Sequence, residues 1–287
     1  MRIQTETGRT AIQLYSPQNR QGGLQVAAGA AIAHPPHDTV ELGSVKPREL
    51  PPDAISHHVS RLFFSPEVNA RLEKVLQDKT AQVEEAAYQL IENNLFKANV
   101  DIPDEERAAL LEVGLTQAKF LADQYFSGQD AADFMDTIHL LAAVAKTRTV
   151  DPATGSVRYA DLPQKPVGAP DDYVDTSKLM QRFDPASYKK MQTAPEDGTE
   201  RISIMLQFVK KLRDQPEWLS EYRKEEQASL DQLKATKLPN RFEQVNTKDL
   251  TSFLQELQAR IADSTPSYKD PLQANVAAFL RVLSRQP

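Results

Sequence analysis

Residues 104–126 read DEERAALLEVGLTQAKFLADQYF, and this stretch decides the fold class. Ile102 and Pro103 precede it, so that Asp104 stands where a helix can begin. Its apolar residues then recur in alternating steps of three and four, the spacing of one helix face in a coiled-coil type of seam. This seam consists of Ala108, Leu111, Leu115, Ala118, Ala122 and Tyr125.

The same helix carries further apolar residues outside the seam. They are Leu110, Phe120, Leu121 and Phe126. A helix that is apolar all round is usually buried, so we expect residues 104–126 to form the centre of a helical bundle. The alternative is that this second face binds a partner. Gly128 is expected to end the helix in a left-handed conformation.

Helices are predicted on both sides of this centre. Ser65, Pro66 and Glu67 form a strong start signal, because Ser caps, Pro has the φ of a first helical residue and Glu suits the first turn. One long helix is predicted from there to about residues 94–99. Another begins near Gln129 and buries one face. Short connections favour antiparallel neighbours, so residues 65–147 are expected to form a three-helix bundle.

Residues 148–175 are predicted to join this bundle to a second helical lobe. Asp151-Pro152 and Gly155 favour a turn, so a small β-hairpin is expected around it, with Tyr159 on the return arm. Prolines and a glycine then exclude regular structure until about residue 175. These residues are Pro163, Pro166, Gly168 and Pro170.

Residues 176–287 are predicted to form the second lobe. Short helices are expected near residues 177–183 and 186–191, separated by the cap pair Asp184-Pro185. The helix that begins at Thr199 is so apolar that we expect it to be the most buried helix of this lobe. The polar segment 216–237 should be peripheral. Thr247 and Asp270-Pro271 are expected to begin the last two helices.

Residues 1–64 are expected to be largely disordered, because Gly22-Gly23, Pro35-Pro36 and Pro51-Pro52 interrupt a stretch without periodicity. Residues 1–33 also contain an apolar run that resembles a targeting segment, but a flexible tail is the favoured interpretation. No apolar run approaches the length of about 20 residues needed to span a bilayer. We therefore expect a soluble, cytoplasmic protein, with an exported or surface-associated protein as the alternative.

The charge distribution disfavours nucleic acid as a partner. The formal net charge is −6, and residues 65–150 alone carry eight Lys or Arg against fifteen Asp or Glu. A protein that binds nucleic acid needs a basic face to neutralise phosphates, and this predicted bundle is acidic. A basic or neutral protein is the expected partner.

The sequence contains no cysteine, which excludes a disulfide, a thiol nucleophile and a thiolate metal site. It also lacks a phosphate-binding Gly-rich loop, a Gly-x-Ser-x-Gly turn and a His-Glu-x-x-His pair. Asp136 and His139 lie three residues apart, the spacing of carboxylate-bridged metal sites in helical bundles, but no second copy of the pair is present. The adjacent His57 and His58, and the acidic stretch of residues 171–175, are better explained as solvated groups.

We therefore expect an all-α protein with no catalytic, cofactor-binding or metal-binding residues. The predicted function is that of a non-enzymatic protein-protein interaction or scaffold protein. The alternative is a metal-dependent enzyme whose carboxylate and histidine site in the bundle includes Asp136 and His139.

Overall fold

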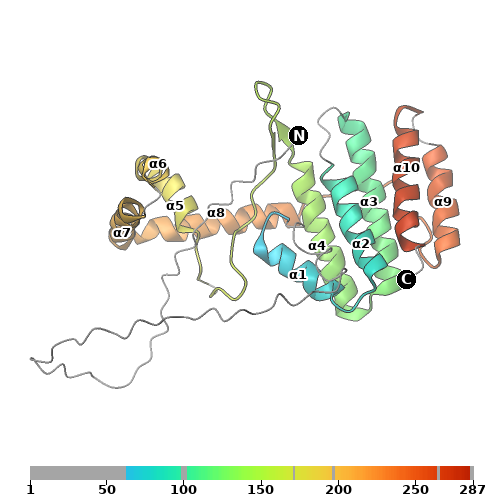
Figure 1. Ribbon diagram of the computed structural model, residues 1–287, viewed down its shortest axis with the longest axis horizontal. Helices are drawn as coiled ribbons and strands as arrows, with labels where there is room; N and C mark the ends of the chain where they lie inside the picture. Colours follow the sequence, from blue (N-terminus) through green and yellow to red (C-terminus); the bar gives the residue numbers. More distant parts are fainter. Residues whose placement is uncertain (1–62, 98–101, 171, 196–197, 264–265, 285–287) are drawn as a thin grey trace, which may run out of the picture. The chain divides into compact units, whose positions relative to one another are not determined.

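The computed structural model describes residues 63–97, 102–170, 172–195, 198–263 and 266–284. This part of the chain is all-α, as predicted, with a single two-stranded sheet (Figure 1). No helix in the described ranges is both long and apolar enough to cross a membrane. The predictions of a disordered tail, a targeting segment and a solvated His57-His58 pair fall on residues outside those described.

The elements follow one another along the chain as α1 (Pro66–Leu76), α2 (Ala81–Leu90), the π-helix η1 (Ile91–Leu95), α3 (Asp104–Tyr125), α4 (Gly128–Lys146), β1 (Thr149–Val150), β2 (Val157–Arg158), α5 (Thr176–Phe183), α6 (Pro185–Thr193), α7 (Thr199–Asp214), α8 (Pro216–Lys234), α9 (Leu250–Ala262) and α10 (Pro266–Leu283).

Helix α3 is the centre of the larger core, as its sequence predicts. Nearly every residue from Ala109 to Ala122 is buried, and α3 packs against α2, η1, α4 and α10 (Figure 1). Phe120 stacks on Phe253 of α9, with ring centroids 4.4 Å apart. The predicted seam is wrong at its two ends, because Ala108 and Tyr125 are exposed.

The predicted continuous helix from Ser65 is also wrong. Ser65 does cap α1, since its hydroxyl accepts a hydrogen bond from the amide of Val68. The helix ends at Leu76, however, and Thr80 has an extended backbone (φ −68°, ψ 153°) before α2 begins. The break falls beside Lys79, which interrupts the apolar stripe, so residues 65–147 hold α1, α2 with η1, α3 and α4 in place of three helices.

Helices α9 and α10 belong to the same core as α1 to α4. Phe253 and Phe279 are both buried there, and α10 packs on α2 and α3. The spacing of apolar residues does not predict packing between helices that are far apart in the sequence. The sequence-based prediction therefore placed these two helices in one lobe with residues 176–249. Whether residues 65–147 and 176–287 fold independently of each other stays a prediction.

The starts of α9 and α10 differ from prediction. Asp249 caps α9 by accepting a hydrogen bond from the amide of Ser252, whereas the Thr247 hydroxyl donates to Asp123. Pro271 lies inside α10, which begins earlier, at Pro266. The Asp270-Pro271 pair therefore lies inside the helix and does not mark its start.

The predicted hairpin is confirmed. Thr149 pairs with Arg158 and Val150 with Val157 in an antiparallel ladder. Gly155, in the turn, has a φ of +68°, which favours glycine over other residues. The return arm brings the Tyr159 ring against two phenylalanine rings, those of Phe64 and Phe96, at 5.4 and 5.3 Å.

Helices α5 to α8 enclose a second, much smaller core. Its buried members are Leu179, Met180, Phe208 and Tyr222. As predicted, Asp184 caps α6, and α8 is mostly exposed. The burial predicted for α7 is wrong, because Phe208 is its only buried residue. Among the described elements, α6 and α8 make close contacts with α7, and these contacts leave Ile202, Leu206 and Val209 exposed.

Candidate functional site: an exposed apolar face of α7

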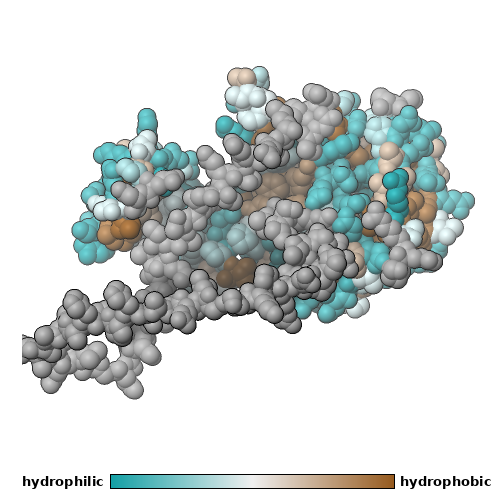
Figure 2. All heavy atoms as spheres, viewed as in Figure 1, coloured by the Kyte–Doolittle hydropathy of each residue, from teal (hydrophilic) through white to brown (hydrophobic). Residues whose placement is uncertain are grey.

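Three large apolar side chains of α7 lie at the surface. The exposed fractions of Ile202, Leu206 and Val209 are 48%, 53% and 40%. Steps of four and three residues place them in one row along the helix, which we call the α7 row. Where Figure 1 labels α7, Figure 2 shows hydrophobic atoms at the surface beside hydrophilic ones. The three side chains therefore lie along one side of the helix.

The adjoining face of α7 holds the helix in place. Phe208 is fully buried, and its ring lies 6.4 Å from that of Trp218 in α8. Ile204, Met205 and Leu212 are partly buried around the same small core. Because these contacts hold α7 against the small core, the α7 row lies on a helix whose position is fixed.

An ion pair ties α7 to α6. Lys211 donates to the carboxylate of Asp184, which also accepts a hydrogen bond from the amide of Ser187 and so caps α6. Burial alone would raise the pKa of the Asp184 carboxyl. The hydrogen bonds from Lys211 and Ser187 outweigh that effect and hold this pKa below its ordinary value.

Positive charge borders one end of the α7 row. Arg213 continues the row four residues after Val209, and Lys210 follows Leu206 by four residues. Both cations are exposed, and Arg213 has only a weak contact, 3.9 Å, with the exposed Asp214. Glu200 lies near the other end but on the far side of the helix, two residues before Ile202. The face therefore changes from apolar to cationic toward its C-terminal end.

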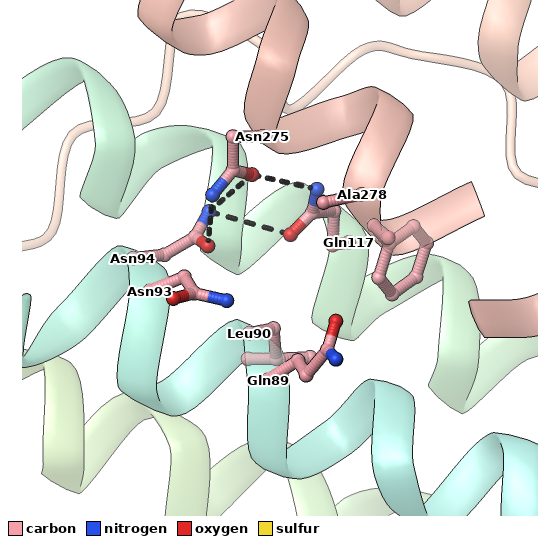
Figure 3. Close-up of a pocket in the computed structure, with 8 residues that line it drawn as sticks. Gln89, Leu90, Asn93, Asn94, Gln117, Asn275 and Ala278 are labelled. Atoms are coloured by element: carbon pink, nitrogen blue, oxygen red, sulfur yellow. Dashed lines mark hydrogen bonds between the residues drawn. The ribbon is translucent and has the colours of Figure 1, made fainter. Parts of the chain in front are cut away.

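A buried cluster of carboxamides is the other notable polar feature (Figure 3). Asn94 of η1 donates to Gln117 of α3 and to Asn275 of α10, at 3.3 and 3.2 Å, and Asn275 donates back to Asn94 at 2.8 Å. Gln117 also donates to Asn275. Beside them is a small, partly open pocket, also lined by Gln89 and Phe279.

The side-chain amides of this cluster are hydrogen-bonded to one another. The Asn94 amide nitrogen additionally donates to the carbonyl oxygen of Leu110, 3.1 Å away. A closed network that links three helices is what a packing device requires, because satisfied buried polar groups restrict how the helices fit together. We therefore assign the carboxamide cluster to the fold and not to ligand binding.

The residues that the sequence singled out as metal ligands lie at the surface. Asp136 and His139 are both exposed on α4. Across the described ranges, no three His, Asp or Glu side chains gather as a metal ion would require. In the acidic stretch of residues 171–175, Asp175 caps α5 by accepting hydrogen bonds from Ser177 and Lys178.

The sequence does not reveal the α7 row, because apolar residues at helical spacing predict buried side chains. The warning sign was present: Ile204 and Phe208 supply one apolar face, and the row supplies another. Two apolar faces on one helix require packing partners on both sides, and the described part of the chain provides them on one. No family model, curated protein or solved structure matches this chain.

Proposed function

We propose that this chain is a non-enzymatic interaction protein, and that its α7 row binds an amphipathic helix of a partner protein that carries acidic residues. The supporting observation is the row itself, three large apolar side chains exposed together on a helix whose other side is anchored. Apolar side chains that gather on one exposed helix face and border charged residues are a feature of interaction sites.

The shape and charge of the face favour a helical, acidic occupant. The α7 row and the Arg213 side chain beyond it together extend about 16 Å along the helix, at about 1.5 Å per residue, which is the footprint of about three helical turns. A helix lying along it would insert apolar side chains at the i, i+3, i+4 and i+7 spacing of helix-in-groove recognition. Carboxylates on that helix would then meet Lys210 and Arg213, which steers association and sets orientation.

The expected affinity is modest. Burying the exposed halves of the three side chains contributes about 3 kcal/mol, at the usual worth of 1.5–3 kcal/mol for a whole aliphatic side chain. A nanomolar complex requires about 12 kcal/mol. The interaction should therefore be reversible and depend on salt, unless the partner also covers neighbouring surface.

A designed helical peptide with a leucine row and flanking glutamates tests the proposal directly. Its binding to the full chain is measured by fluorescence anisotropy. Leu206→Glu should weaken binding by at least tenfold, because it places a charge within the apolar contact. The matched control is Val167→Glu, which alters a side chain that is 72% exposed in a loop away from α7. It should bind as the wild type does.

Two further outcomes define the occupant. The double variant Lys210→Glu/Arg213→Glu should bind the glutamate peptide more weakly than the wild type does. It should bind a peptide with glutamines in place of the glutamates as the wild type does. Binding that is unaffected by Leu206→Glu would contradict the proposal. So would light scattering that shows the chain alone to be a dimer that Leu206→Glu dissociates, because the row would then belong to a second copy.

A further inference from the structure

Helix α6 packs antiparallel against α7, on the side away from the α7 row (Figure 1). Near the C-terminal end of α7, Lys211 donates to the carboxylate of Asp184 at the start of α6. Near the N-terminal end, the Nε atom of Arg201 donates to the carbonyl oxygen of Ala194, just after α6, at 3.2 Å. Lys211 comes nine residues after Ile202, about two and a half turns, which places it on the reverse of the helix.

The acidic residue at the start of α6 has two roles in this contact. Its carboxylate accepts a hydrogen bond from the amide of Ser187 at 3.2 Å, which caps α6, and it also pairs with Lys211. Carboxylates are favourable at the N-terminal end of a helix, where free amides carry partial positive charge, and cations are favourable at the C-terminal end. Because the helices are antiparallel, these two ends meet, and Asp184 stabilises both its own helix and the contact between helices.

The row side of α7 has the same order of charge along the helix. Lys210 and Arg213 are exposed in its last two turns, and Arg213 is in line with Ile202, about three turns further on. The N-terminal part of the row is flanked instead by Thr199 and Ser203, which are exposed and uncharged. Positive charge beside the row is therefore concentrated at its C-terminal end.

We infer that the helix that binds the α7 row runs antiparallel to α7 and carries its acidic residues in its first turn, ahead of its apolar residues. This inference rests on the function proposed above and adds the order of residues in the partner. The acidic first turn then meets Lys210 and Arg213, as Asp184 of α6 meets Lys211 on the reverse side.

The parallel orientation lacks this agreement. An acidic first turn would then lie beside the uncharged Thr199 and Ser203. Carboxylates that reached Lys210 and Arg213 would have to stand in the last turn of the partner helix, where the free carbonyl oxygens disfavour negative charge. The antiparallel orientation is the one in which the same carboxylates stabilise the partner helix and pair with α7.

Two designed peptides of identical composition test the order of charge. One carries a run of glutamates before a leucine row, and the other carries the same run after it. Fluorescence anisotropy with the full chain should show about fivefold tighter binding of the acidic-first peptide. Circular dichroism of the free peptides gives the part of this ratio that comes from helix content. Lys210→Gln/Arg213→Gln should remove the rest, whereas Lys189→Gln/Lys190→Gln, at exposed lysines of α6, is the matched control and should retain it.

Disulfide cross-linking measures the direction of the bound helix, because the chain has no cysteine of its own. Ser203→Cys and Asp214→Cys place a thiol on the same exposed flank of the row, about 16 Å apart at about 1.5 Å per residue. An acidic-first peptide with an N-terminal cysteine should cross-link about tenfold faster to Asp214→Cys than to Ser203→Cys, because proximity raises the effective thiol concentration. Moving the peptide cysteine to the C-terminus should reverse the preference.

The outcomes separate this inference from the proposed function. Equal cross-linking at both positions, or faster reaction of the N-terminal cysteine with Ser203→Cys, would overturn the antiparallel orientation. So would an acidic-first preference that Lys210→Gln/Arg213→Gln leaves unchanged. In each of these cases, binding that Leu206→Glu still weakens would leave the proposed function standing. Binding of either peptide that is insensitive to Leu206→Glu would contradict the proposed function, and the orientation with it.

Discussion

At the scale of single residues, the tightest constraint lies between Gly114 and Asn94. A Cβ atom added to Gly114 would lie 2.6 Å from the Cβ of Asn94, closer than real Cβ atoms approach. This contact lets η1 cross α3 closely enough for Asn94 to reach Gln117 and Asn275. Nothing in the sequence marks this glycine as different from one that merely weakens a helix.

Gly114→Ala is therefore expected to destabilise the protein. In an exposed helix the change would stabilise by about 1 kcal/mol through helix propensity. Here the clash is with backbone-proximal atoms, and overpacking of this kind costs about 1–3 kcal/mol or more. We expect a net loss, read as a lower urea midpoint with an unchanged m-value. A higher midpoint would show that η1 can move away freely.

Asp184 should make stability depend on pH. Its carboxyl pKa is lowered in the folded state, so the stabilisation is complete above the unfolded pKa of about 3.9 and is lost as the pH falls through the lowered folded value. Asp184→Asn keeps a good helix cap but cannot titrate. The stability difference between wild type and Asp184→Asn should shrink below about pH 4. A difference that stays constant from pH 7 to pH 2 would contradict the pairing with Lys211.

At the scale of elements, α3 and α7 show when the spacing of apolar residues predicts burial correctly and when it does not. Both helices are apolar on more than one side, and the same rule predicted burial for both. It succeeded for α3, which packs against α2, α4 and α10, and failed for α7, whose described neighbours bury Phe208 alone among its residues. Helix spacing thus predicts where helices form, while burial also depends on how many other helices arrive from distant parts of the chain.

Substitutions on the buried and exposed faces of α7 should differ in how strongly they destabilise the protein. Phe208→Ala removes a fully buried ring and should cost about 3–5 kcal/mol of unfolding free energy. Leu206→Glu alters a side chain that is 53% exposed and should change stability by less than about 0.5 kcal/mol. Urea unfolding of both variants measures the contrast. A large loss for Leu206→Glu would mean that the row is covered in the free protein.

At the scale of the whole chain, the class and most helices could be predicted, but the composition of the cores could not. The hairpin and the caps at Ser65 and Asp184 are local, and the sequence showed them. The stacking of Phe120 on Phe253 joins residues 133 positions apart, and the α7 row depends on helices that are missing from one side. Neither leaves a trace in local spacing.

Truncation tests this shared core. Removing residues 250–287 deletes α9 and α10 and exposes Phe120, which is 1% exposed in the structure. We expect the shortened chain to lose cooperative unfolding and to bind a hydrophobic dye. A shortened chain that unfolds cooperatively at the wild-type midpoint would instead support the predicted independent bundle of residues 65–147.

The accessibility of the α7 row is the central claim, and thiol labelling measures it most directly, because the chain has no cysteine of its own. Leu206→Cys should react with a thiol reagent nearly as fast as in urea, Phe208→Cys should be strongly protected, and the acidic helical peptide should slow labelling at position 206. Slow labelling of Leu206→Cys in the monomer without peptide, or a rate that the peptide leaves unchanged, would contradict the account.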